Sequence, residues 1–214
     1  MKSMCFRAAA WLQKTSFVEY ITLKGGFCMD KITLKQLAAA AGEVRGRIGR
    51  IYLHWTAGWY DSTFADYHVN ITGDGSIYLS TSDLTEVLAH TWRRNTGAVG
   101  VALCCCVDAT ICADGSFSLG SVPPTCLQIE SAAKVIAVLT EALDLPINPE
   151  CVLTHAEVAD IDGYGPAQIA AGSFEKWDLW RLPDYDGTWR SGGDVLRGKA
   201  LWYRARHAAD KIIS

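Results

Sequence analysis

Short apolar runs that alternate with helical patterns constrain this chain more than any other feature. Residues 50–56 (RIYLHWT), 98–107 (AVGVALCCCV) and 150–158 (ECVLTHAEV) are rich in apolar and β-branched side chains, as buried strands are. Residues 125–144 follow two prolines and begin with a Thr125–Gln128 capping box, which is typical of a helix start. This interleaving predicts an α/β fold: a single domain with one mixed central sheet flanked by helices.

Three further segments complete the predicted architecture. Residues 29–47 are rich in Ala and Leu and predict an N-terminal helix. Residues 67–80 (YHVNITGDGSIYLS) alternate apolar and polar side chains around Gly73-Asp74-Gly75, which predicts a β-hairpin. The tail over residues 185–214 places apolar side chains at helical spacing, so we expect it to be helical.

The first 28 residues differ from the main domain, which we expect over residues 48–184. They contain no continuous apolar segment of the kind that a signal peptide needs. Lys24-Gly25-Gly26 can be encoded by a purine-rich stretch that resembles a bacterial ribosome-binding site just before the Met29 codon. Two interpretations stay open: translation starts at Met29, or residues 1–28 form an ordinary N-terminal helix.

The composition argues against several classes of protein. The chain has 214 residues, enough to bury a sizeable core, and a net charge of −3. Nucleic-acid binding usually shows a basic surplus, so we expect no nucleic-acid partner. No apolar run approaches the roughly 20 residues of a membrane span. The eight cysteines do not suggest a disulfide scaffold, and we expect the adjacent Cys104, Cys105 and Cys106 to be reduced strand residues of a protein folded in the cytosol.

Two of the five histidines share a local pattern. His54 and His155 each follow an apolar run, so each is expected at the carboxyl end of a strand, the edge where ligands gather in α/β sheets. If the two strands are neighbours, both imidazoles face one point, where zinc would need a third ligand and would leave its fourth position to water. A histidine satisfied within the core is the alternative. The candidates for a third ligand are Asp160, Asp162, Asp178 and Asp184, with Cys151 poorly placed on the strand itself.

Five sequence elements occur in an order that resembles one enzyme family. They are LHWTAG (53–58), YHVNITGDGSIY (67–78), AHTWRRNTGAVGVAL (89–103), LTHAEV (153–158) and EKWDLW (175–180). Over about residues 48–184 the chain resembles the zinc-dependent N-acetylmuramoyl-L-alanine amidases, the family that includes bacteriophage lysozyme-type amidases and is related to peptidoglycan recognition proteins. Each motif is weak by itself, so the resemblance rests on their order.

The resemblance implies a zinc centre. It makes His54, His155 and Asp178 the ligands of one Zn²⁺ per chain, and it makes Tyr67 and Lys176 the polar catalytic residues. Two neutral imidazoles and one carboxylate would leave the ion a net positive charge, which lowers the pKa of a bound water to roughly 7. The implied reaction is hydrolysis of the amide between the lactyl group of N-acetylmuramic acid and L-alanine in peptidoglycan.

Two departures from the family pattern keep a second assignment of the third ligand open. Leu179-Trp180 stands where the family has Pro-Gly, and the gap between the second and third ligands is longer than usual. Asp160 or Asp162 is therefore the alternative ligand. We favour Asp178 because a lysine precedes it by two positions.

Two rival functions stay open. A zinc-free peptidoglycan-binding module of the same fold would bind the wall without cleaving it. A cysteine peptidase acting on cell-wall peptides would need a cysteine at a helix start beside a histidine, and Cys126 has no obvious partner of this kind. In the amidase interpretation we expect His90 and Asn95 to bind muropeptide, with stabilisation of their own loop as the alternative.

The biological setting is also an expectation. We expect cytoplasmic synthesis without a signal peptide and action on the cell wall. An endolysin of a phage or prophage would reach the wall after a holin-type protein opens the membrane, whereas a wall-recycling amidase would work in the cytosol. The expected partner is peptidoglycan or a muropeptide, and the expected oligomeric state is a monomer.

Overall fold

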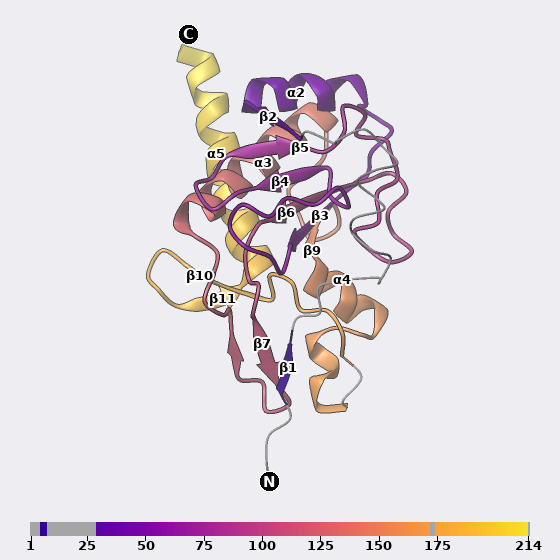
Figure 1. The fold of residues 1–214 in the computed structure, drawn as a ribbon. Coiled ribbons are helices and arrows are strands. Elements are labelled where there is room, and N and C mark those ends of the chain that lie inside the picture. Colours follow the sequence, from indigo (N-terminus) through magenta and orange to yellow (C-terminus); the bar gives the residue numbers. More distant parts are fainter. Residues whose placement is uncertain (1–4, 8–28, 172–173, 214) are drawn as a thin grey trace.

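A mixed six-stranded sheet forms the centre of the computed structural model, which describes residues 5–7, 29–171 and 174–213 (Figure 1). In spatial order its strands are β2 (Asp30–Ile32), β5 (Ile77–Leu79), β4 (Val69–Ile71), β6 (Ala98–Leu103), β3 (Arg50–Trp55) and β9 (Val152–Thr154). β3 pairs in parallel with β6 and β9, and β4 pairs in parallel with β6. β5 is antiparallel to both β4 and β2. The α/β fold predicted from the sequence is confirmed.

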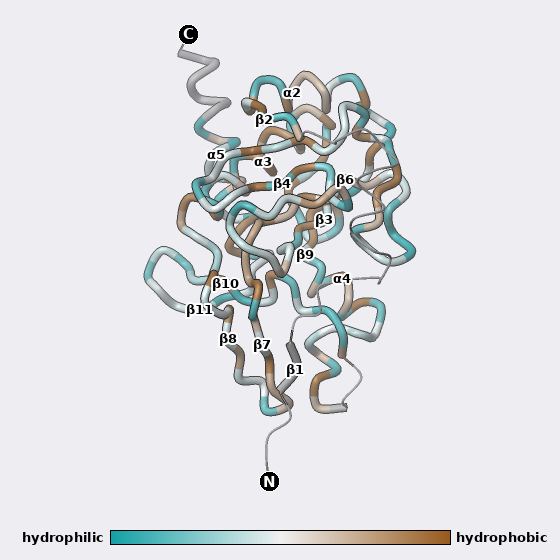
Figure 2. Tube along the Cα trace, in the orientation of Figure 1, coloured by the Kyte–Doolittle hydropathy of each residue, from teal (hydrophilic) through white to brown (hydrophobic). Residues whose placement is uncertain are grey.

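Helices cover both faces of this sheet. α2 (Leu34–Glu43), α3 (Cys126–Leu143) and α5 (Gly192–Ile213) contribute to the main hydrophobic core on one face. α4 (His155–Asp162), followed by the 3₁₀ helix η1 (Pro166–Ala171), contributes to a smaller cluster on the other face. Figure 2 shows the hydrophobic stretches along the central strands and the hydrophilic ones in the surrounding loops. The apolar runs of the sequence are therefore the buried strands.

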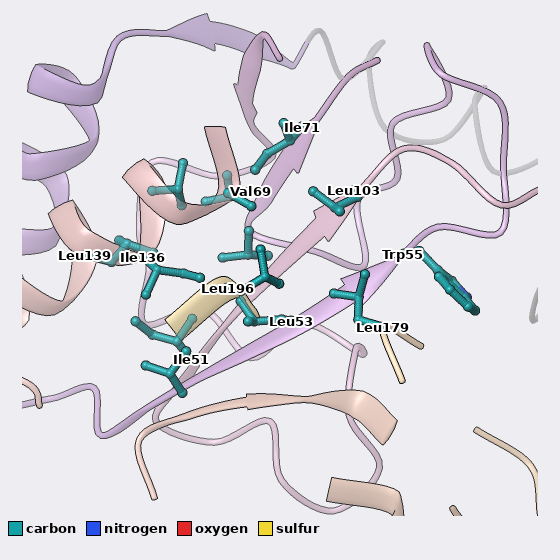
Figure 3. Close-up of a cluster of buried hydrophobic side chains, with 14 of the residues drawn as sticks. Ile51, Leu53, Trp55, Val69, Ile71, Leu103, Ile136, Leu139, Leu179 and Leu196 are labelled. Carbon is teal, nitrogen blue, oxygen red and sulfur yellow. The ribbon is translucent and has the colours of Figure 1, made fainter. Parts of the chain in front are cut away.

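The side chains of β3 alternate between these two faces. Ile51, Leu53 and Trp55 belong to the main core, because alternate residues of a strand share a face. Figure 3 shows this face of the sheet with residues of α3 and α5 (Ile51, Leu53, Ile136, Leu139, Leu196). Tyr52 lies in the smaller cluster, and His54 shares its side of the strand. The fold thus separates the packing face of β3 from the face that carries the histidine.

Strand β6 leaves room on the histidine face. In the parallel register, Tyr52 pairs with Gly100 and His54 pairs with Ala102, so two small residues lie beside two large ones. A Cβ atom on Gly100 would lie 2.6 Å from Cγ of His90, which packs against this glycine. Such a distance is far below van der Waals contact. Gly100 is therefore needed where the His90 ring crosses the strand.

Two small sheets lie outside the central one. β1 (Cys5–Arg7), β7 (Thr110–Cys112) and β8 (Phe117–Ser118) form the first, and β10 (Arg181–Pro183) and β11 (Trp189–Ser191) form the second. Cys112 is disulfide-bonded, which the sequence did not predict, and its cross-strand neighbour is Cys5. Residues 5–7 are therefore not helical, in contrast to one of the two interpretations of residues 1–28. The rest of that helix lies outside the described residues, and a translation start at Met29 stays a prediction.

Four predicted segments differ from the structure. The helix expected over residues 29–47 is confirmed only over Leu34–Glu43, because Asp30–Ile32 pairs with β5 as a strand and Thr33 forms a capping box with Gln36. The strand expected over residues 98–107 ends at Leu103, and the strand expected over residues 150–158 ends at Thr154, because α4 begins at His155. The helix expected over residues 185–214 begins only at Gly192, because Trp189–Ser191 pairs with β10 as a strand.

The three adjacent cysteines follow the end of β6. They are free and buried, as expected, but Cys106 adopts a left-handed backbone conformation (φ 68°) and leaves the strand direction. Within the described residues, no helix is both long and apolar enough to cross a membrane.

Deletion of residues 1–28 should leave the domain folded. The six-stranded sheet begins with β2, and the described core residues all follow it, so the deletion removes the edge strand β1 from a separate small sheet. The thermal midpoints of the full-length and truncated chains measure this. A full-length Cys112→Ser variant separates the effect of the disulfide from that of the strand. An insoluble truncated chain would show that residues 1–28 pack on the domain.

Candidate metal centre

His54 and His155 converge at one edge of the sheet. His54 is the fifth residue of β3, and His155 directly follows β9 and begins α4. Because β3 and β9 are parallel neighbours with Leu53 opposite Thr154, both histidines reach the same level of the sheet. Their ring centroids are 4.8 Å apart in an edge-to-face arrangement. Both side chains are buried.

Asp178 brings a carboxylate between the two imidazoles. Its Oδ2 lies 3.6 Å from Nδ1 of His54 and 3.4 Å from Nδ1 of His155. One ligand atom from each of the three residues lies within 4.8 Å of the others. The preceding residue, Trp177, is buried and packs edge-to-face on Trp55 with ring centroids 4.7 Å apart, which fixes the segment that carries Asp178. These three residues can form a metal site.

The donor set fits a zinc ion. Nδ1 of His54 is a buried polar atom without a hydrogen-bond partner, and such atoms are costly unless a ligand satisfies them. Burial lowers the pKa of His54 to about 4, against the opposing effect of the nearby Asp178 carboxylate, so the imidazole is neutral at pH 7. Burial opposes ionisation of Asp178, but the two neighbouring imidazoles outweigh it and hold its pKa below the ordinary value. Neutral imidazoles and an ionised carboxylate are the forms that bind Zn²⁺.

Tyr67 and Lys176, the two predicted catalytic residues, lie at the same edge. The Tyr67 ring is 5.1 Å from the His54 ring, and its hydroxyl donates a long hydrogen bond of 3.5 Å to the Trp55 carbonyl. Burial and the charge of Asp178 raise the pKa of Tyr67 above its usual value, so its phenol stays protonated. The charge of Lys176 contributes to lowering the pKa of His54, and no ion pair to Lys176 occurs among the described residues.

His90 and Asn95 contact their own loop. His90 is 6% exposed, and its ring lies 5.4 Å from that of His54. It packs on Gly100 of β6, and β6 lies on the side of β3 opposite to β9. Its Nδ1 is 3.0 Å from the Thr91 hydroxyl. The Asn95 side-chain oxygen accepts a 2.6 Å hydrogen bond from the Thr91 backbone N–H. These contacts support loop stabilisation, the alternative to the predicted muropeptide contact.

The other candidate metal ligands have different partners. Asp162 forms a bidentate ion pair with Arg94, Asp160 accepts a 2.7 Å hydrogen bond from the Ala167 N–H, and Asp184 pairs with Arg190. Cys151 precedes β9, at the end of the strand opposite to His155. Within the described part of the chain, the grouping of possible ligands at this edge contains Asp178 alone among the aspartates.

Two residues of this region were not singled out in the sequence. The Thr91 hydroxyl lies 3.2 Å from Nε2 of His54. Tyr164 packs near His155 with ring centroids 6.4 Å apart, and its hydroxyl is buried without a hydrogen-bond partner. Thr91 follows His90 directly, but nothing in its sequence context marks it, because its contact with His54 depends on strand pairing. Tyr164 lies in the long connection between the second and third candidate ligands.

A comparison with protein families gives a match over more than half of the chain. Residues 44–169 match the family model described as N-acetylmuramoyl-L-alanine amidase. The match includes His54, Tyr67 and His155, and it ends before Lys176 and Asp178, which the fold brings to the same edge. No curated protein matches the chain. The match supports peptidoglycan amidase activity.

The metal-free protein should lose stability as the pH falls from 6.5 towards 4. Burial lowers the pKa of His54 to about 4 and that of His90 to about 2, so both are neutral in the folded chain and take up protons on unfolding in this range. The stability that depends on these neutral imidazoles is complete above pH 6.5, and each histidine removes about 1.4 kcal/mol per pH unit below it. Denaturant unfolding at pH 7, 6 and 5 after chelator treatment measures the slope. A flat profile would contradict this prediction, and His90→Gln should make the slope shallower.

Proposed function

This chain belongs to the N-acetylmuramoyl-L-alanine amidase family, and we propose that it is a zinc-dependent hydrolase of peptidoglycan. The bond cleaved is the amide between the lactyl group of N-acetylmuramic acid and L-alanine. The observation that supports zinc dependence is the convergence of His54, His155 and Asp178, with Nδ1 of His54 buried and without a hydrogen-bond partner. A satisfied core histidine would not leave this atom unpaired.

In this proposal, His54, His155 and Asp178 hold the ion, which supplies Lewis acidity and lowers the pKa of a water molecule. Hydrolysis adds the elements of water across the amide: the carbonyl carbon gains an oxygen, the C–N bond breaks, and the amine leaves with a proton. The carbonyl oxygen becomes negatively charged before the C–N bond breaks. Lys176 provides positive charge near this edge, and Tyr67, whose phenol keeps its proton, can donate a hydrogen bond to that oxygen.

Two exposed indoles suit a glycan substrate. Trp59 lies on the segment that follows His54 and is 58% exposed, and Trp92 lies in the His90–Asn95 loop and is 63% exposed. The Arg93 guanidinium stacks on Trp92 at 4.1 Å from the ring centroid and holds that ring. We propose that these indoles pack against the apolar faces of sugar rings. Trp55 and Trp177 are buried and serve packing instead.

Metal analysis combined with a cleavage assay tests the function. The purified protein should bind one zinc ion per chain, and zinc should raise its thermal midpoint because the ion binds the folded state. Cell-wall suspensions should lose turbidity and release new amino termini of L-alanine, and a chelator should stop both. Wall binding without zinc and without cleavage would instead identify the rival function, a binding module.

Substitutions at Asp178 and Lys176 should separate a metal ligand from a catalytic charge. Asp178→Ala should lower zinc affinity and cleavage together. Lys176→Ala should keep zinc, because an ammonium group cannot ligate it, and should slow turnover by about 10²–10³, or about 3–4 kcal/mol of barrier. Asp184→Ala is the matched control, since this carboxylate pairs with Arg190 instead. If Asp162→Ala removed zinc and Asp178→Ala did not, the ligand assignment would be wrong.

The endolysin and wall-recycling settings differ in the substrate presented to the same site. An endolysin acts on intact cell wall after holin-type release, whereas a recycling amidase acts on soluble muropeptides in the cytosol. Cleavage rates on isolated walls and on purified soluble muropeptides distinguish the two settings.

A further inference from the structure

We propose that Thr91 is a positioning residue that orients His54 for metal binding and links its protonation pattern to that of His90. This inference rests on the proposed zinc site. It concerns a hydroxyl that touches neither the substrate nor the metal, and it gives a role to the loop that contains His90 and Asn95.

The Thr91 hydroxyl is enclosed between two imidazoles. The side chain of Thr91 is 1% exposed. Its Oγ1 lies 3.2 Å from Nε2 of His54 and 3.0 Å from Nδ1 of His90. The opposite nitrogen of His54, Nδ1, faces Asp178 and has no hydrogen-bond partner. The two nitrogens of His54 therefore have separate surroundings: one faces the candidate metal ligands and the other faces Thr91.

A count of protons favours one arrangement when metal is bound. A neutral imidazole that binds metal through Nδ1 carries its proton on Nε2. Among the described residues, Nε2 has Oγ1 of Thr91 as its hydrogen-bond partner, and this oxygen must then accept the proton. The Thr91 hydroxyl then donates its single proton in a hydrogen bond to Nδ1 of His90, which is 3.0 Å away. His90 would consequently carry its own proton on Nε2. If both hydrogen bonds ran in the opposite direction, the His54 proton would be on Nδ1, where it would prevent metal binding.

The loop holds Thr91 at this point from two sides. Its backbone N–H donates to the Asn95 side chain at 2.6 Å, and its carbonyl accepts from the Arg94 N–H at 3.1 Å. The Arg94 guanidinium then makes two hydrogen bonds, of 2.8 and 2.5 Å, to Asp162 at the end of α4. Because α4 begins with His155, the loop and the second histidine are tied to the same helix.

His90 and a further histidine, His68, are fixed as well. Gly100 accommodates the His90 ring, and its backbone N–H donates a 3.0 Å hydrogen bond to Nδ1 of His68. Nε2 of His68 lies 2.9 Å from the Glu86 carbonyl and donates to it. His68 is therefore neutral, with its proton on Nε2. Hydrogen-bond partners that orient metal-binding histidines typically change metal affinity by 10–100-fold when they are removed.

The test compares hydroxyl-bearing and hydroxyl-free side chains at position 91. Thr91→Val keeps the shape and removes the hydroxyl, so zinc affinity, measured by competition with a chelator, should fall by about 10–100-fold. Thr91→Ser should retain most of the affinity because the hydroxyl remains. Thr96→Val, at an exposed threonine of the same loop, is the control and should bind zinc as the unsubstituted chain does. The thermal midpoints of the metal-free chains show whether each variant folds, and Thr91→Ala replaces Thr91→Val if the latter does not.

A second measurement determines directly which imidazole nitrogen of His90 carries the proton. Imidazole ¹⁵N spectra of the zinc-loaded, unsubstituted chain should show His90 protonated on Nε2, whereas protonation on Nδ1 would overturn the proposed order of protons. Unchanged zinc affinity in the folded hydroxyl-free variant would overturn the positioning role, and an equal loss in Thr91→Ser would assign the effect to packing of the methyl group. If the unsubstituted chain bound no zinc, the proposed function itself would fail, which is a different outcome from all of these.

Discussion

The parallel pairing of β3 with β6 and β9 is the constraint on which the rest of the structure depends. It brings His54 and His155 to one edge, although they are far apart in the sequence, and it places Gly100 and Ala102 beside the histidine face of β3. A shift of one residue in this register would turn His54 into the main core. The hydrophobic packing of α2, α3 and α5 on the opposite face holds the register, so the core determines the geometry of the candidate site.

The segments around the site contain strained backbone. Among the described residues other than glycine, five have positive φ angles, and three of these, Ala57, Arg93 and Leu179, lie within three residues of His54, His90 or Asp178. A conformation of this kind costs on the order of 1–3 kcal/mol and persists when the surroundings impose it. Leu179 is almost fully buried, and the neighbouring Trp177 packs on Trp55. Packing thus imposes the turn that directs the Asp178 carboxylate towards the two imidazoles.

Much of the fold and part of the site could be predicted from the sequence. Local patterns identified β3, the hairpin, α3 with its capping box and the ends of the strands that carry His54 and His155, because burial and capping leave residue-level signals. The sequence could not locate β2, whose three residues become a strand only by pairing with β5. It also overlooked Thr91, whose partner, His54, is distant in the chain and reaches it through strand pairing.

The third candidate ligand shows why spacing was a weak guide. The connection between His155 and Asp178 contains α4 and η1. It then turns back on itself, because the Glu175 N–H donates a 2.8 Å hydrogen bond to the Tyr164 carbonyl. The Ala156 N–H donates to the Asp178 carbonyl at 3.2 Å, which ties the end of this connection to its beginning. The length of the connection therefore has little influence on where the Asp178 carboxylate lies. Asp160 and Asp162 lie nearer to His155 in sequence, but on α4 they face Ala167 and Arg94. Closure of the chain, and not proximity in sequence, selects the carboxylate that meets the two histidines.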